Sequence, residues 1–335
     1  MMRIVHHLDE MIWREFVMNN PRGNIFHSPE MYQVFARSKG FSPALWAVLD
    51  DDGAVQALML TAKITVIGGI FQFMTTRAVV YGGPLCSDHK QGQVALDFLL
   101  HEYNRHAARN VLFTEFRNVH DVSDLRPTLE NSGYYFEDHL NFLIDLTRPS
   151  QELWKNIRSN AQRNIRKAQK SGVTIEEAHT PEDVDAAYVI LQDVYHRIQV
   201  PLPDRSLFTA AFEALHPKNM MHILFARLNG VNIGALTLLT YKGNILYWYT
   251  GPLREYTEYR AGDLLVWSAI EFGKKLNCHT FDFGGGGRPD EEYGVRDFKL
   301  KFGGQQVNFG RNVCVHAPTR LRVSEFGYSV LRRFL

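Results

Sequence analysis

Residues 281–304, FDFGGGGRPDEEYGVRDFKLKFGG, combine several residue types that could carry chemistry. Asp282 lies just before four consecutive glycines, which let a backbone turn tightly or a ligand approach it closely. Lys299 follows Phe298, and a lysine whose stem is anchored by aromatic neighbours can hold its ammonium in a cleft, where it stabilises an oxyanion. The segment has neither the Gly-Lys-Ser/Thr of a P-loop nor a dinucleotide fingerprint. The alternative is a flexible loop followed by a surface lysine.

A second candidate is the basic segment between Gln151 and Gly172, which is predicted to form one helix over Glu152–Ser171. It contains one acid, Glu152, and six basic residues, namely Lys155, Arg158, Arg163, Arg166, Lys167 and Lys170. A helix that needs only solubility usually mixes charges through i,i+4 pairs, so this composition favours attraction of a phosphate-bearing partner. Nucleotide sugars, lipid pyrophosphates, CoA and tRNA all fit that description, and a solvated helix face is the alternative.

Two tyrosines form a third candidate. Tyr247 and Tyr249 are separated by one residue in a predicted strand, so we expect them on the same face of that strand. Tyr249 is a catalytic candidate and Tyr247 a substrate-binding candidate, whereas aromatic core packing is the alternative for both.

Composition excludes several classes of protein. The chain has 335 residues, 45% of them hydrophobic, and 37 Lys and Arg against 36 Asp and Glu, so it can build a packed core but has no general attraction for polyanions. Its 3 cysteines are far apart, and no paired histidine motif is present. We therefore expect reduced thiols, no metal, no tightly bound cofactor and no DNA partner.

No apolar run approaches the roughly 20 residues of a membrane-spanning helix. The first residues contain acids where a signal peptide needs an apolar stretch. We expect a cytoplasmic protein without a transmembrane segment, either free or peripheral at the inner membrane face.

The elements that must position these residues alternate between helices and strands, which predicts a mixed α/β fold of the α+β kind. Apolar runs separated by glycine turns predict a three-stranded meander over residues 222–252, followed by a helix over Gly262–Leu276. Both halves share this order of elements. We expect two domains, 1–147 and 148–335, divided at a Pro-Ser break.

The C-terminal motifs, taken in order, resemble the FemABX-like branch of the GNAT acyltransferase superfamily. The matching pieces are Asn160–Val173, Ala261–Gly273, Phe281–Gly285 and Phe298–Gly304. The N-terminal half resembles the family in its layout and in residues 23–35, GNIFHSPEMYQVF. The resemblance implies tandem GNAT-like domains, each a mixed, mostly antiparallel sheet flanked by helices. It also implies an acyltransferase or aminoacyltransferase that modifies an amine of a peptidoglycan or polysaccharide precursor.

Three departures from the peptidoglycan type leave the acceptor open. The chain lacks the coiled-coil insertion that some members carry. Phe35 stands where a lysine is common, with Arg37 and Lys39 displaced from that position. Leu202 precedes Pro203 where the precursor-binding type tends to have arginine.

The resemblance implies aminoacyl-tRNA or acyl-CoA as the donor. Ordinary GNAT enzymes hold the CoA pyrophosphate in a glycine-containing loop before a helix, and here Arg260 and Gly262 do not have that loop's spacing. This favours a donor other than CoA. One alternative is an acetyl-CoA-dependent N-acetyltransferase acting on an amino sugar. Another is a catalytically silent module that binds a nucleotide sugar or RNA.

These observations define a candidate site and its partners. Lys299 is the expected charge stabiliser, and Tyr249 is a further catalytic candidate. Asp282 is a base or a group that orients the acceptor amine, and the alternative is that it only organises the loop after its strand. Glu255 lies near the loop before the predicted helix. The candidates for substrate binding are Arg163, Arg166, Lys167, Tyr247, Tyr256, Asp263, Gly284, Gly285 and Phe298. The expected partner is a phosphate-bearing small molecule or a lipid-linked precursor, with tRNA as a candidate donor.

Overall fold

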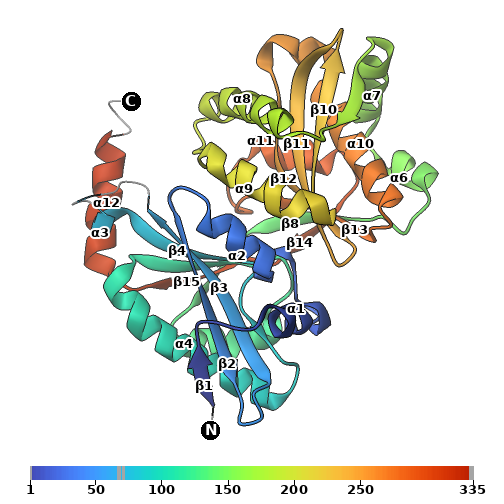
Figure 1. Cartoon of the computed structure of the whole chain (residues 1–335). Helices are drawn as coiled ribbons and strands as arrows, with labels where there is room; N and C mark the ends of the chain where they lie inside the picture. The colour runs from blue at the N-terminus through green and yellow to red at the C-terminus, as the bar shows by residue number, and fades with distance from the viewer. Residues whose placement is uncertain (1, 66–68, 70–71, 332–335) are drawn as a thin grey trace. The chain divides into compact units, whose positions relative to one another are not determined.

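The computed structural model describes residues 2–65, 69 and 72–331, which divide into two units (Figure 1). Unit 1 comprises Met1–Asp138 and Phe309–Leu335, and unit 2 comprises His139–Asn308. This division differs from the predicted domains 1–147 and 148–335. The strand before the Pro-Ser break pairs within unit 2, and the last strand of the chain pairs within unit 1.

Unit 1 contains an eight-stranded sheet in the order β1-β2-β3-β4-β6-β15-β7, with β5 paired to β3. Its strands are β1 (Arg3–Val5), β2 (Phe41–Leu49), β3 (Val55–Thr65), β4 (Thr76–Tyr81), β5 (Leu85–Cys86), β6 (Phe113–Arg117), β7 (Tyr135–Glu137) and β15 (Arg311–Val315). Its helices are α1 (Glu10–Asn19), α2 (Pro29–Ala36), α3 (Gln72–Thr75), α4 (Lys90–Asn110), α5 (Arg126–Asn131) and α12 (Pro318–Leu331), with short 3₁₀ turns at Ile25–His27 and Ser123–Leu125.

Unit 2 contains a seven-stranded sheet in the order β14-β8-β13-β12-β11-β10-β9. Its strands are β8 (Leu140–Asp145), β9 (Thr174–Glu177), β10 (Met221–Leu228), β11 (Val231–Tyr241), β12 (Asn244–Pro252), β13 (Thr280–Gly285) and β14 (Gln305–Asn308). Its helices are α6 (Ser150–Asn156), α7 (Ser159–Lys170), α8 (Pro181–Arg197), α9 (Arg205–Leu215), α10 (Ala261–Lys275) and α11 (Gly294–Leu300), with 3₁₀ turns at His216–Lys218 and Arg254–Tyr259.

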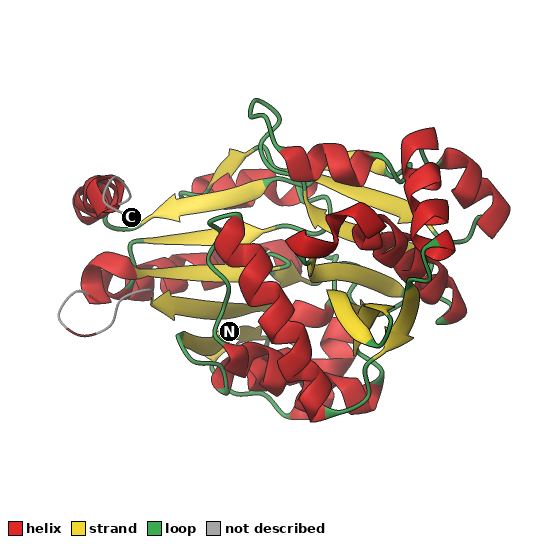
Figure 2. Ribbon diagram, turned by 90° about the horizontal axis from the view of Figure 1, so that it is seen from above, coloured by secondary structure: helices red, strands yellow, loops and turns green. Residues whose placement is uncertain are grey.

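Helices cover both faces of the unit 2 sheet (Figures 1 and 2). The buried side chains of α7 and α10 pack in one apolar core with Leu236 and Leu238 of β11. Helices α8 and α9 contact the opposite face, where Tyr195 and Phe208 lie against Tyr249. Each unit is thus a mixed, mostly antiparallel sheet flanked by helices, which confirms the predicted α+β class. The predicted meander is β10, β11 and β12.

The basic segment forms two helices, α6 and α7, where the sequence predicts one. The chain is extended at Ile157, whose side chain is buried. The backbone groups freed by the break find partners, since Gln162 donates from its amide to the carbonyl of Ile157 at 3.0 Å. Arg158 donates its N–H to the carbonyl of Lys301 at 2.8 Å. Because these backbone groups are hydrogen-bonded, the break in the helix costs little free energy, and it lets the Ile157 side chain enter the core.

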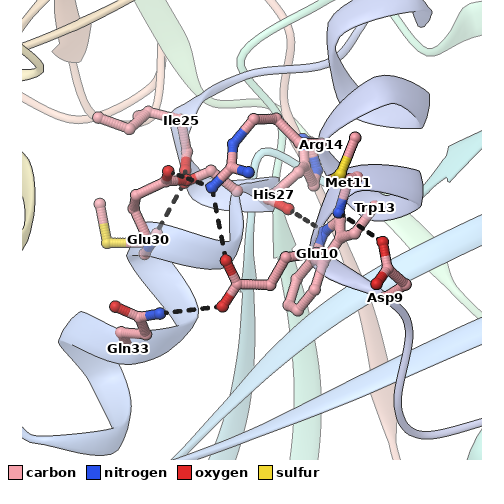
Figure 3. A network of polar contacts seen from close by, with 11 residues as sticks. Asp9, Glu10, Met11, Trp13, Arg14, Ile25, His27, Glu30 and Gln33 are labelled. Atoms are coloured by element: carbon pink, nitrogen blue, oxygen red, sulfur yellow. Dashed lines mark hydrogen bonds and ion pairs between the residues drawn. The ribbon is translucent and has the colours of Figure 1, made fainter. Parts of the chain in front are cut away.

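Residues 23–35 of unit 1 are held by a polar network between α1 and α2 (Figure 3). The indole of Trp13 donates to the carbonyl of His27 at 2.6 Å, and Arg14 pairs with the buried Glu30 at 2.6 Å. Phe35, which stands where the family commonly has a lysine, is 3% exposed and stacks on Phe41 with ring centroids 5.4 Å apart. This position therefore belongs to the core and presents no charge to a ligand.

The structure also bears on membranes, cysteines and metals. No helix among the described residues is both long enough and apolar enough to cross a membrane. Cys86, Cys278 and Cys314 are free and buried. Within the described ranges, no three His, Cys, Asp or Glu side chains gather as metal ligands would.

Candidate functional site

Strands β12 and β13 of unit 2 run parallel and then separate. They pair over three positions, from Asn244 opposite Thr280 to Leu246 opposite Asp282. Beyond this point β12 continues along β11 to Pro252, while β13 turns along β8 to Gly285. We call this opening the β12–β13 fork. The carboxyl ends of parallel strands are where open α/β sheets place their ligands.

The parallel strands of unit 1 do not separate in this way. Strands β4 and β6 pair from Ala78 opposite Thr114 to Tyr81 opposite Arg117, the last residue of each strand. The pairing even extends one step further, because Gly82 donates its N–H to the carbonyl of Arg117 at 2.9 Å. A fork between parallel strands is thus a feature of unit 2.

Lys299 lies at the fork. It projects from α11, and its Nζ donates to the carbonyl oxygens of Phe283 at 2.6 Å and Gly285 at 2.7 Å. The ammonium also lies 5.8 Å from the centre of the Tyr247 ring. The residue is only 5% exposed, and this burial lowers the pKa of Lys299 to about 8, an effect that the charge of Asp282 opposes.

Asp282 occupies β13 beside the same glycines. Its carboxylate accepts hydrogen bonds from the amide of Asn141 at 2.8 Å and from the N–H of Gly284 at 2.6 Å. Burial raises the pKa of Asp282, while these two hydrogen bonds and Lys299 oppose the rise. An acid with a raised pKa beside a lysine with a lowered one is an arrangement suited to proton transfer near neutral pH.

The glycine run is closely packed against neighbouring side chains, which disfavours the flexible-loop alternative. A Cβ at Gly285 would lie 2.7 Å from the His139 ring, and one at Gly286 would lie 2.5 Å from the Phe142 ring. Arg296 donates to the carbonyl of Gly286 at 3.0 Å. Two cations of one helix, Arg296 and Lys299, therefore fix the backbone of this loop.

Tyr247 and Tyr249 lie on opposite faces of β12, so the expectation of a shared face is wrong. Leu238 of β11 lies opposite Tyr247, but its neighbour Thr237 lies opposite Tyr249, which leaves Trp248 as the extra residue of a β-bulge. The bulge breaks the two-residue alternation. Tyr247 faces Lys299, whereas Tyr249 packs against Tyr195 of α8 and Phe208 of α9.

Asp263 lies in the first turn of α10 and is 7% exposed. One carboxylate oxygen accepts a long hydrogen bond from Asn164 at 3.4 Å, and the other has no partner among the described residues. Burial raises the pKa of Asp263. A helix N-terminus ordinarily attracts anions, so a carboxylate in this turn disfavours a phosphate group there. Nearby, Tyr256 packs against the core of unit 2 and Glu255 is exposed.

The other binding candidates fall into two groups. Gly284 and Gly285 belong to the fork, and Phe298 packs on Phe302 with ring centroids 5.4 Å apart. Arg163, Arg166 and Lys167 are exposed on α7, and no contact between described residues joins them to Lys299 or Asp282. The structure thus gathers the fork residues and leaves the basic helix as a separate surface.

Asn141 and Arg296 are fork residues that the sequence did not reveal. Asn141 is a single polar residue inside the apolar strand β8, and it reaches Asp282 only because β8 pairs with β13. Its position between Leu140 and Phe142 is the one available signal, since a polar side chain in such a strand needs a partner. Arg296 gives no signal, because it acts entirely through backbone carbonyls.

Comparison with known proteins agrees with this geometry. Residues 155–299 match the family model of the acetyltransferase (GNAT) domain. The crystal structure of FemX superposes with a TM-score of 0.73 at 14% identity, covering 96% of this chain and 99% of that one. The fold is that of tandem GNAT-like domains. The resemblance to the FemABX-like branch is confirmed at the level of the fold.

Two further structures share this arrangement. L-PGS from Bacillus licheniformis has a TM-score of 0.61 at 14% identity and covers 95% of this chain and 96% of its own. A tandem GNAT protein from the clavulanic acid biosynthesis pathway has a TM-score of 0.60 at 11% identity, with coverages of 94% and 99%. No curated protein sequence matches the chain significantly.

Proposed function

We propose that this chain is an acyltransferase or aminoacyltransferase that transfers its group to an amine of a cell-envelope precursor at the β12–β13 fork. The observation that carries the proposal is Lys299, a buried cation between separating parallel strands, with a pKa of about 8 and Asp282 beside it. The tandem GNAT fold and the GNAT family match over residues 155–299 support the reaction class.

The reaction is aminolysis of an ester or thioester. The nitrogen of a neutral amine attacks the carbonyl carbon, the C–N bond forms, and the C–O or C–S bond breaks as the amine proton passes to the leaving group. An ammonium has three N–H donors. Lys299 uses two in short bonds, and its third hydrogen bond, to the carbonyl of Gly284, is long at 3.4 Å, so in this proposal the tetrahedral oxyanion replaces that weakest acceptor. Asp282 then receives or relays the amine proton.

The donor and acceptor belong to the same proposal. Asp263 in the first turn of α10 disfavours a pyrophosphate at that helix end, so the proposal takes aminoacyl-tRNA as the donor and keeps acyl-CoA as the alternative. Peptidoglycan and polysaccharide precursors, soluble or lipid-linked, are the acceptor class implied by the resemblance of the C-terminal motifs to the FemABX-like branch. A cytoplasmic location beside the inner membrane face would suit such an acceptor.

A second candidate is an acetyl-CoA-dependent N-acetyltransferase acting on an amino sugar. The family match over residues 155–299 favours it, because that family is described as an acetyltransferase domain. Release of the free CoA thiol distinguishes this reaction from aminoacyl transfer.

The test is a mass shift on a defined acceptor. The purified chain is incubated with a UDP-linked muramyl peptide or a glucosamine-containing oligosaccharide, and with alanyl-tRNA or acetyl-CoA. One combination should add the mass of the transferred group. Lys299→Met should lose roughly 100-fold or more in turnover, as expected for one preorganised transition-state contact, whereas Lys301→Met should retain activity. Equal turnover of the two variants would remove Lys299 from the chemistry, and ligand binding without any mass shift would favour a silent module.

A further inference from the structure

Helix α7 presents a stripe of positive charge along its exposed side. Arg163, Arg166, Lys167 and Lys170 follow the i, i+3, i+4, i+7 spacing of one helical face, and all four side chains are exposed. The opposite face, formed by Ala161, Ile165 and Ala168, is fully buried in the unit 2 core. We call these four cations the basic stripe. At 1.5 Å per residue it extends over roughly 10 Å.

The cations of the basic stripe have no acidic partner among the described residues, whereas cations of two other helices are paired within their own helix. Arg14 of α1 pairs with Glu10 at 3.7 Å, and Arg197 of α8 pairs with Asp193 at 3.8 Å. The stripe has no such internal pairs, and the single cation–π contact of Arg166 with Trp154, at 5.3 Å, leaves its charge intact.

Acids on either side of α7 in the sequence are paired elsewhere. Glu152 pairs with Arg148 at 3.3 Å, and Glu176 pairs with Arg227. Asp263 of helix α10 is buried and contacts Asn164 on the flank of α7, not the stripe. The stripe thus has no acidic partner among the described residues, and an external anion is the partner that its composition fits.

The surface itself indicates which kind of anion. Proteins that bind single-stranded RNA stack its bases on aromatic side chains. The aromatic side chain that contacts the stripe through Arg166, Trp154, is already packed edge-on against Trp267, with ring centroids 5.0 Å apart. A free nucleotide needs donors that converge on a concave site, whereas the stripe follows the convex side of a helix. A fluid layer of anionic lipid headgroups can arrange itself under separated cations, and each Lys or Arg near it contributes about 1 kcal/mol.

We propose that the basic stripe docks unit 2 on an anionic lipid surface. This deepens the proposed function, on which it rests for the lipid-linked nature of the acceptor. Vesicle binding is measured without catalysis, so the two proposals can fail separately. An absence of vesicle binding would not contradict acyl transfer, and vesicle binding can still be measured if acyl transfer is not detected.

The experiment compares three full-length proteins by co-sedimentation with vesicles of equimolar phosphatidylglycerol and phosphatidylcholine. One is the native chain, and one carries Arg163→Gln, Arg166→Gln and Lys167→Gln. The matched control carries Lys90→Gln, Arg109→Gln and Lys275→Gln, which remove the same charge from exposed sites on α4 and α10. The native chain should bind these vesicles and not pure phosphatidylcholine. The stripe variant should lose roughly 100-fold in partitioning, and the control should retain most of its binding.

Several results would overturn the proposal. Equal losses in the two triple variants would show an effect of net charge alone. Glycerol phosphate that displaces the chain from vesicles at matched phosphate concentration would indicate a site for free phosphate. An RNA oligonucleotide that binds through the stripe while the vesicles do not bind would identify RNA as the partner. A further variant with Arg163→Lys and Arg166→Lys keeps the charge, so it should bind vesicles like the native chain. This variant is the control for a loss of vesicle binding that is caused by misfolding.

Discussion

Replacing Lys299 by methionine should change how the stability of this protein depends on pH. The pKa of Lys299 is about 8 in the folded chain, and the ordinary value for an unfolded lysine is 10.5. Between these two values the unfolded chain binds more protons than the folded one, so the free energy of unfolding rises with pH. Over this pH interval the free energy of unfolding increases by about 3 kcal/mol. The increase requires a residue at position 299 that can titrate.

A second effect of Lys299→Met is independent of this titration. The variant removes the donor from the carbonyls of Phe283 and Gly285, in a place that is 5% exposed. Loss of a buried partner costs roughly 1–3 kcal/mol, so the variant should be less stable than the native chain at high pH, where Lys299 is neutral in both states. The stability of the native chain relative to the variant should rise by about 3 kcal/mol as the pH rises from 8 to 10.5.

Urea unfolding at a series of pH values measures both effects. Lys301→Met is the matched control, because it removes a neighbouring half-buried lysine, whose ammonium lies 5.3 Å from the centre of the Phe298 ring, and leaves Lys299 with its carbonyl partners, so it should keep the rise of stability with pH that Lys299 gives. Tyrosines and other lysines titrate in all three proteins and cancel in the comparison. Parallel curves for the native chain and Lys299→Met would refute the reasoning, because they would show that residue 299 titrates alike in both states.

Three further predictions concern neighbouring groups and unit 1. Asp282→Asn removes the charge that raises the pKa of Lys299, so the rise of stability with pH should begin at a lower pH in the same urea series. Gly286→Ala places a Cβ 2.5 Å from a core aromatic ring and should cost about 1–3 kcal/mol, whereas Gly294→Ala meets open space and should be neutral or slightly stabilising in thermal unfolding. Burial lowers the pKa of His316 to about 4 from 6.5, so the unfolded chain binds the extra proton and stability should fall from pH 6.5 to 4. His316→Gln should flatten that fall, and an unchanged slope would contradict the assignment.

Local patterns in the sequence were sufficient for most of the elements. Ser28 and Pro29 predict the start of α2, and the Ser28 hydroxyl does accept the N–H of Met31 at 3.1 Å. The meander and the helix after it follow from apolar runs and glycine turns, and the order of the motifs indicated the tandem GNAT fold. These features depend on neighbours in the chain, which a sequence displays directly.

The features that the sequence did not predict depend on residues far apart in the chain. The bulge at Trp248 is a property of the pairing between β11 and β12, and no local pattern marks it. The partner of Asp282 is 141 residues away, at Asn141. The sequence pointed to Lys299, but the carbonyls to which it donates are fixed by the packing of α11 on the glycine loop. The break in the basic helix likewise depends on a contact with Lys301.

The position of β15 in the sheet has a consequence for the order in which the two units can finish folding. This strand lies between β6 and β7 in the interior of the unit 1 sheet, although it leaves the ribosome after every other described strand. All of unit 2, residues 139–308, is synthesised before it. The second unit can therefore finish folding while the first waits with unpaired edges on β6 and β7, which is the state in which unfinished sheets are most prone to aggregate. A truncation before Arg311 would leave that gap permanently open, even though it removes none of the residues of the β12–β13 fork.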